Sequence, residues 1–208
     1  MTAFDKAMRL IDAAHAEDPH LVPILGGLST DQGVKGGETH EIPYELHYAN
    51  KMTTYLHLRC PHASDTLRLA IRAQHLRRWE VPRETYPSTK AGYHAWRSGL
   101  QRRQAELVAS LCEEAGYSSA EAMRVATLVR KESFRQGDGD EEAQVLEDVA
   151  CLVFLDDQFA GFRDGREDEK IVTILKKTWA KMSPQGRDLA LGIEMGERER
   201  ELVVRAIS

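Results

Sequence analysis

The sequence predicts an all-α protein, folded as one helical domain over residues 1–208. Apolar residues recur at helical spacing in one segment after another, next to residues that cap helix ends. No segment alternates strictly between apolar and polar residues, and none carries a hairpin signal. Hydrophobic residues make up 42% of the chain, which is enough to form one sizeable core. The sequence shows no internal repeat. We expect a helical bundle of roughly seven or eight helices.

The first two predicted helices are separated by a long connection. Residues 3–17 carry an apolar stripe that Pro19 ends, and residues 44–59 carry a second stripe. Residues 19–43 between them are rich in Gly and Pro and have no period, which is typical of a functional or mobile segment. The stripes consist of Phe4, Met8, Leu10, Ile11 and Ala14, and of Ala49, Met52 and Leu56.

Two more helices flank a loop at residues 81–92. The first covers residues 64–78, with Ser64 or Asp65 as its N-cap. The second runs from about Lys90 to Ala115, where Gly116 is suited to the position after the helix. Their apolar faces contain Leu67, Ala70, Ile71 and Gln74, and Tyr93, Trp96, Leu100, Leu107 and Leu111.

Four helices are predicted for the rest of the chain. A capping box, "SSAE" at 118–121, opens the first, and "GDGD" at 137–140 interrupts the chain after it. The segment "VLEDVACLVFL" is apolar nearly all round from residue 149 to 155, so it should form the buried central helix. The amphipathic run "EKIVTILKKTWAKM" follows, and Ser183 with Pro184 begins the terminal helix.

Composition and charge exclude several classes of protein. A net charge of −5 gives no general attraction to nucleic acid or to an anionic membrane. No apolar run approaches the roughly 20 residues that span a bilayer, and the charged N-terminus lacks a signal-peptide core, so we expect a cytoplasmic protein. Cys60, Cys112 and Cys151 are far apart, which favours small buried groups over a disulfide framework or a thiolate zinc site.

The segment "RAQHLRRWEVPR" concentrates polar chemistry at the end of a predicted helix. His75 is a candidate metal ligand or catalytic group, and the alternative is an ordinary histidine at the edge of the core. Arginines around it can hold a phosphate or carboxylate through bidentate contacts, or can form a solvated face. These candidate substrate-binding residues are Arg72, Arg77, Arg78 and Arg83.

Polar residues also interrupt apolar faces near the ends of other predicted helices. Glu147 and Asp148 precede the most apolar helical segment, where a carboxylate is costly unless it is paired or binds a metal. Glu45 heads an apolar face, or is a first-turn acid favoured by the helix dipole. Lys131 and Glu132 end another stripe and either point to the same interior or lie at the surface. Convergence of such residues from several helices is what an all-α metal site requires.

Three motifs resemble a family of small cytoplasmic proteins with a domain of unknown function, sometimes labelled glutamyl-tRNA synthetase. They are "QHLRRWEVPRETYP…GYHAWR", "LEDVACLVFL" and "KTWAKMS". The synthetase label is rejected, because "KMSPQG" shares only three letters with a KMSKS-type loop and no HIGH-like partner or nucleotide-binding α/β pattern is present. The family has no settled activity, so this resemblance supplies little mechanism.

The helix order is distantly similar to that of the HD-domain metal-dependent phosphohydrolases. At the positions of that family's ligands this chain has Glu45, the pair Gln74 and His75, and Asp148. The resemblance implies an HD-like core in which Glu45, His75 and Asp148 hold one or two divalent ions (Mn, Fe, Mg or Zn). Two of the usual ligand types are changed, so a degenerate relative without hydrolytic activity fits the same residues.

Together these observations predict a metal-dependent hydrolase of a small phosphorylated or otherwise anionic compound. A metal would polarise the phosphoryl group and lower the pKa of a bound water. The four arginines would bind the substrate anion, and Lys131 and Glu132 would act in catalysis. The alternative is a non-catalytic helical protein that binds a ligand or serves as a scaffold, using the arginine-rich face around His75.

Overall fold

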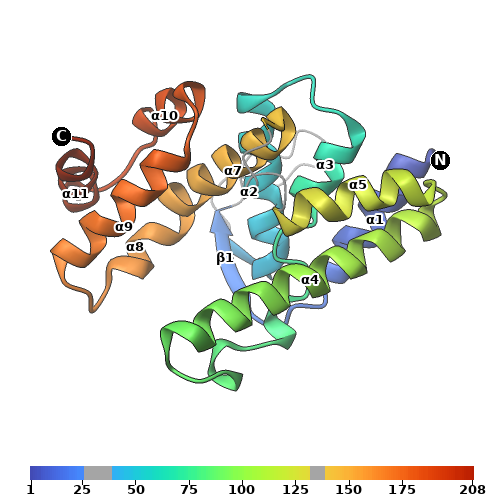
Figure 1. The fold of residues 1–208 in the computed structure, drawn as a ribbon, viewed down its shortest axis with the longest axis horizontal. Coiled ribbons are helices and arrows are strands. Elements are labelled where there is room, and N and C mark those ends of the chain that lie inside the picture. The colour runs from blue at the N-terminus through green and yellow to red at the C-terminus, as the bar shows by residue number, and fades with distance from the viewer. Residues whose placement is uncertain (26–38, 132–138) are drawn as a thin grey trace.

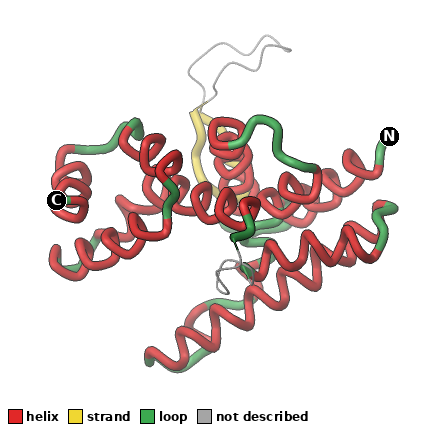
Figure 2. Tube along the Cα trace, turned by 45° about the horizontal axis from the view of Figure 1, so that its top comes forward, coloured by secondary structure: helices red, strands yellow, loops and turns green. Residues whose placement is uncertain are grey.

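The computed structural model describes residues 1–25, 39–131 and 139–208, and most of them are helical (Figures 1 and 2). The prediction of an all-α fold is therefore confirmed. In the first half of the chain lie α1 (Ala3–His15), β1 (Leu21–Leu25), β2 (Thr39–Pro43), α2 (Tyr44–Arg59), α3 (Asp65–Arg72) and α4 (Lys90–Ala115). The second half contains α5 (Ser119–Arg130), α7 (Glu141–Val153), α8 (Phe159–Arg163), α9 (Asp168–Lys181), α10 (Pro184–Leu191) and α11 (Glu197–Ile207).

Helix starts agree with the capping residues read from the sequence. The Ser118 hydroxyl accepts from the backbone N–H of Glu121, whose carboxylate accepts from the Ser118 N–H, which completes the predicted capping box. Ser64 caps α3, and Ser183 caps α10 with Pro184 at its first position. The helix α4 ends at Gly116 with a φ of 106°, a conformation that glycine adopts without strain. Local chemistry therefore sets these boundaries.

Two short strands are the part of the fold that the sequence prediction missed. β1 and β2 pair antiparallel, from Leu21 opposite Pro43 to Leu25 opposite Thr39. Each strand contains a proline, Pro23 or Pro43, a residue that argues against a strand because it cannot donate a ladder hydrogen bond. The ribbon has no fully buried side chain among those described in it. The sequence of β1 is apolar throughout and that of β2 begins with three polar residues, so neither shows the apolar–polar alternation that predicts a half-buried strand.

The ten α-helices of the described residues exceed the expected seven or eight because two predicted helices are divided. After α7 the chain makes one π-helical turn, Phe154–Gln158, before it continues as α8. The terminal helix is likewise split into α10 and α11. The predicted helix 64–78 is in turn shorter than expected and stops at Arg72, because His75 and Arg77 adopt φ values of 65° and 50°.

Two apolar clusters form the core, and α7 belongs to both. One cluster is built from α1 to α5 with Leu146 and Val149 of α7. The other combines Cys151 and Leu152 of α7 with α8 to α11, which gather at the opposite end of the molecule from α1 and α5 (Figure 1). The prediction that this helix is buried and central is confirmed. Of the described helices, none has the length and apolar character needed to span a bilayer.

Candidate functional site

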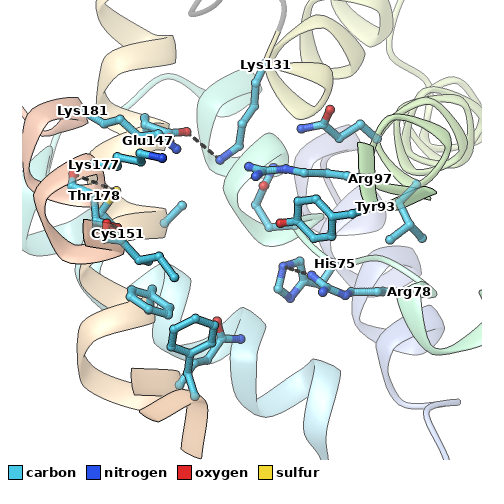
Figure 3. A pocket seen from close by; sticks show the side chains of 18 of the residues that line it. His75, Arg78, Tyr93, Arg97, Lys131, Glu147, Cys151, Lys177, Thr178 and Lys181 are labelled. Carbon is cyan, nitrogen blue, oxygen red and sulfur yellow. Dashed lines mark hydrogen bonds and ion pairs between the residues drawn. The ribbon is translucent and has the colours of Figure 1, made fainter. Parts of the chain in front are cut away.

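A cavity of about 900 Å³ lies where the two apolar clusters face each other beside α7. Figure 3 shows its two walls: Lys131, Arg97 and Arg78 on one side, and Lys177 and Lys181 on the other. The first wall comes from α4, from the end of α5 and from the turn after α3, and the second comes from α7 to α9. Its volume is in the range of cavities that enclose a metabolite-sized ligand.

Basic side chains dominate this cavity. Among the described residues that line it, eight are cations and one, Glu147, is an acid, a formal charge of +7 when His75 is neutral. The cations are Arg78, Lys90, Arg97, Lys131, Arg166, Lys170, Lys177 and Lys181. The whole chain has a net charge of −5, so this concentration of positive charge is local and cannot result from composition.

Glu147 sits between two of these cations. Lys131 Nζ donates to Glu147 Oε2 at 2.8 Å, and Lys181 Nζ donates to Glu147 Oε1 at 3.1 Å. Burial raises the pKa of this carboxyl, but the two ammonium groups outweigh burial and hold the pKa at about 2. The carboxylate thus ties the end of α5 to the end of α9 across the cavity.

Other cavity cations have no acidic partner among the residues that the structure describes. Arg97 and Lys177 make no hydrogen bond or ion pair to any residue in the described part of the chain. Arg78 donates to a histidine nitrogen and lies over the ring of Trp96, with 4.9 Å from its Cζ to the ring centroid. Burial lowers the pKa of Arg78, which nonetheless stays charged at neutral pH because a guanidinium titrates far above it. An anion that enters the cavity therefore meets positive groups that no carboxylate of the described residues neutralises.

His75 is held in the cavity wall in a fixed orientation. Its ring stacks on Tyr48 with centroids 4.0 Å apart, and Arg78 Nη1 lies 2.9 Å from its Nε2. Burial, followed by the charges of Arg78 and Lys131, lowers the pKa of His75 well below 6.5. Because an arginine can only donate, Nε2 must be the acceptor, which assigns the proton of the neutral ring to Nδ1.

Two cavity residues share an uncommon backbone conformation. His75 and Lys131 have φ values of 65° and 57°, in the left-handed region that costs a non-glycine residue free energy. Lys131 with its positive φ caps the end of α5, whereas His75 lies in the turn three residues after α3, and both residues line the cavity. Strain of this kind concentrates at binding sites, and here it falls on two of the residues that the sequence singled out.

One buried amide in the cavity wall lacks a partner. Gln104 is only 6% exposed, and its Nε2 has no hydrogen-bond acceptor among the described residues. A buried donor left unpaired costs roughly 1–3 kcal/mol, so native proteins seldom leave one without a reason. A ligand acceptor in the cavity would satisfy it only after the Gln104 side chain turned toward the ligand, because Nε2 itself is buried.

The predicted site residues are only partly brought together. His75, Arg78 and Lys131 line the cavity, and Glu132 lies outside the described residues. Arg72 is buried elsewhere, with Nε 2.5 Å from Asp12 Oδ1. The others are held by protein partners: Arg77 pairs with Glu17 and Glu80, and Arg83 donates to the carbonyl oxygens of Tyr86 and Pro87.

The three predicted metal ligands do not converge. In the described ranges, no three His, Cys, Asp or Glu side chains are grouped so as to hold a metal ion. Glu45 accepts from the backbone N–H groups of Arg77 and Trp79, and also lies 3.3 Å from His15 Nδ1. Its carboxylate fixes the turn that contains His75, and a metal-ligand role for it stays a prediction.

Asp148 is buried, as predicted, but it is satisfied by protein donors. Arg59 Nε donates to Oδ2 at 2.7 Å, and the Ser183 N–H donates to Oδ1 at 2.8 Å. The Ser183 hydroxyl and Gln144 Nε2 add two more hydrogen bonds. This arrangement corresponds to the paired-carboxylate alternative and joins α7 to α2 and α10.

Sequence reasoning missed the cations on α9 and the residues of α4 that face the cavity. Lys170, Lys177 and Lys181 are spaced by seven and four residues, which places them on one face of α9. Tyr93, Arg97 and Gln104 repeat in the same way along α4. The sequence shows this spacing, but a charged helix face usually faces solvent. Only the packing of α4 and α9 on opposite sides of one cavity distinguishes these two faces from ordinary surface.

Comparison with known proteins identifies a family but no activity. Residues 5–203 match a family described as Domain of unknown function (DUF4202), and this stretch includes nearly the whole chain. No curated protein matches the chain, and no solved structure does. The expected similarity to HD-domain phosphohydrolases stays a prediction.

Proposed function

We propose that this chain, which belongs to the DUF4202 family, binds a small phosphorylated compound in its cationic cavity. The observation that carries the proposal is the excess of eight cations over one carboxylate in the cavity of an acidic protein. Phosphate oxygens are the acceptors that arginine and lysine bind best, through bidentate contacts and point charges respectively.

Charge repulsion gives a physical reason for an anionic ligand. Arg78, Arg97 and Lys177 face a common space without an acidic partner in the described chain, and their mutual repulsion destabilises the protein without ligand. A bound anion would replace that repulsion with charge-assisted hydrogen bonds in a partly desolvated site. Such bonds are roughly twice as strong as neutral ones.

The neutral His75 supports Arg78 in this role. Its Nε2 accepts from Arg78 Nη1 without adding a competing charge, and stacking on Tyr48 fixes the ring plane. Arg78 therefore keeps four of its five N–H donors for other acceptors, apart from its contact over Trp96. We assign His75 the role of positioning Arg78.

Titration with inorganic tripolyphosphate tests the proposal. Arg97→Gln removes a cavity cation on α4, and Arg102→Gln removes an exposed cation from the same helix outside the cavity. Calorimetry should give a dissociation constant raised roughly tenfold by Arg97→Gln, as expected for one charge-assisted contact, and changed less than twofold by Arg102→Gln. Absence of binding, or equal effects of the two substitutions, would contradict the proposal.

Metal-assisted hydrolysis of the bound compound is a second candidate function. One observation favours it: His75 lines the cavity in its neutral form, and its Nε2 would bind a metal ion that displaced Arg78 from that nitrogen. With the metal-stripped protein, phosphate release from tripolyphosphate should require added Mn²⁺, Fe²⁺, Mg²⁺ or Zn²⁺ and should fall in His75→Gln. Binding without phosphate release would instead support the non-catalytic ligand-binding alternative.

A further inference from the structure

We infer that the ligand of this cavity is a nucleoside polyphosphate, with a flat aromatic ring at one end and linked phosphates at the other. The inference rests on the proposed function, because it names the class of compound bound at the same site. Three features of the cavity carry it: cations on both walls, aromatic side chains that remain accessible, and an unpaired buried amide.

The number and placement of cations favour several phosphates over one. A terminal phosphate carries roughly 1.5–2 negative charges near neutral pH, which would leave most of the cavity's charge uncompensated. Arg78 and Arg97 lie on one wall, and Lys177 and Lys181 lie on the facing wall (Figure 3). A chain of phosphates can contact both walls at once, whereas a single phosphate group offers three oxygens at one point.

Aromatic side chains favour a nucleotide over an inorganic polyphosphate, which has no ring to stack on them. Tyr93 is 41% exposed and projects into the cavity between Arg97 and Arg78 (Figure 3). Phe154 and Phe162 also line the cavity, partly exposed and edge to face with centroids 5.6 Å apart. Accessible aromatic faces beside cations are the combination that binds nucleobases by stacking.

Gln104 carries a hydrogen-bond donor, which a ligand with only an apolar aromatic ring could not satisfy. Its Nε2 is buried in the cavity wall and lacks an acceptor in the described residues. Nucleobases present ring nitrogens and carbonyl oxygens at their edges, and a nucleotide also offers ribose and phosphate oxygens. Each is an acceptor that this donor would meet if the Gln104 side chain turned toward the occupant, because Nε2 itself is buried.

The test compares nucleoside triphosphates with the two parts of the molecule. ATP, GTP, CTP and UTP, inorganic tripolyphosphate and the four free nucleosides are titrated into the full-length protein by calorimetry. At least one triphosphate should bind roughly tenfold or more tightly than tripolyphosphate and than its own nucleoside, the gain expected from stacking one base.

Two substitutions separate ring recognition from phosphate recognition. Phe162→Leu should remove most of the nucleotide's advantage and leave tripolyphosphate binding within twofold of wild type. Arg166 lies over one face of Phe162, with 4.2 Å from its Cζ to the ring centroid. Phe4→Leu is the matched control, because Arg68 lies over Phe4 at the same distance and Phe4 is outside the cavity. It should change neither affinity.

The possible results distinguish the inference from the proposed function. If tripolyphosphate binds as tightly as every nucleotide, or Phe162→Leu has no effect on nucleotide affinity, the nucleotide inference is overturned and the anion site stands. If a nucleoside binds as tightly as its triphosphate, the inference is overturned as well. If neither nucleotides nor tripolyphosphate bind, the inference and the proposed function both fail.

Discussion

Glu147 shows at the scale of one residue how the cavity is assembled. It is the single acid among the described lining residues, and its two oxygens accept from Lys131 and Lys181 on different helices. A carboxylate with 4% relative exposure is costly without such partners. It holds two cations at the cavity edge while cancelling only one of their charges.

Replacing Glu147 with Gln should loosen the fold and strengthen anion binding. The substitution removes an ion-paired carboxylate, so we expect a loss of roughly 2 kcal/mol in the free energy of unfolding at pH 7. The folded-state pKa of about 2 lies below the ordinary 4.5, so the carboxylate stabilises above pH 4.5 and this contribution is lost as the pH falls toward 2. Urea unfolding of both proteins should show a smaller difference in the free energy of unfolding at pH 3 than at pH 7.

Tripolyphosphate affinity gives the second readout for the same variant. Two lysines lose their competing carboxylate, so the dissociation constant should decrease several-fold. A variant that binds the anion more weakly than wild type would show that Glu147 orders the lysines more than it neutralises them.

His75 should stay neutral across the ordinary histidine range. Burial and the nearby charges of Arg78 and Lys131 lower its pKa well below 6.5 in the folded protein. In the unfolded chain the same imidazole binds a proton as the pH falls through about 6.5. Stability should therefore fall as the pH drops below about 6.5, because the unfolded state then binds more protons. The NMR signal that His75→Gln removes should show no titration between pH 8 and pH 5.5, and a midpoint near 6.5 would contradict this environment.

At the scale of elements, Asp148 connects three helices through one carboxylate. It accepts from Arg59 at the end of α2 and from the N–H and hydroxyl of Ser183, which begins α10. The next turn of α10 packs so closely on Asp148 that a Cβ built on Gly186 would come 2.7 Å from the carboxyl carbon. The glycine therefore permits the approach that lets the N-terminus of α10 bind the buried carboxylate.

Gly186→Ala should destabilise the protein, with Gly161→Ala as its control. The added methyl would force Asp148 or α10 to move, at a cost of roughly 1–3 kcal/mol. A Cβ on Gly161, in α8, meets no atom within 4 Å, so alanine there should be neutral or stabilising by up to about 1 kcal/mol. Thermal unfolding of the two variants decides it, and equal melting temperatures would show that α10 adjusts without strain.

At the scale of the whole molecule, charge is segregated. The cavity has a formal charge of +7 while the chain totals −5, so the rest of the protein carries −12. The net charge outside the cavity repels an anion, whereas the charge of the cavity attracts it. Low-dielectric walls of α4 and α9 on either side focus that attraction.

Anion binding should consequently be sensitive to salt. Raising the ionic strength from about 0.05 M to about 0.5 M shortens the Debye length to a few ångströms, so the affinity for tripolyphosphate should weaken roughly tenfold or more. Calorimetry across a series of KCl concentrations measures the slope. Arg97→Gln should reduce this slope, and Arg102→Gln should leave it nearly unchanged because Arg102 does not line the cavity.

The sequence by itself determined the helical class, most helix boundaries and the buried central helix. Caps and apolar spacing act within a few residues, so Ser118, Ser183 and Gly116 end or begin helices as their local chemistry dictates. It also identified His75, Arg78 and Lys131, which line the cavity. Periodicity could not detect the β1–β2 ribbon, because two prolines and exposed side chains hide its pairing.

Only the tertiary structure decided which polar residues face each other. Glu45 and Asp148 could be metal ligands or structural carboxylates, and the N–H groups and Arg59 that occupy them come from distant segments. Likewise Lys177 on α9 and Arg97 on α4 are 80 positions apart in the sequence. They line the same cavity because α7 joins the two apolar clusters. Helix faces follow from local spacing, but the cavity between them depends on packing across the chain, which no short stretch of sequence encodes.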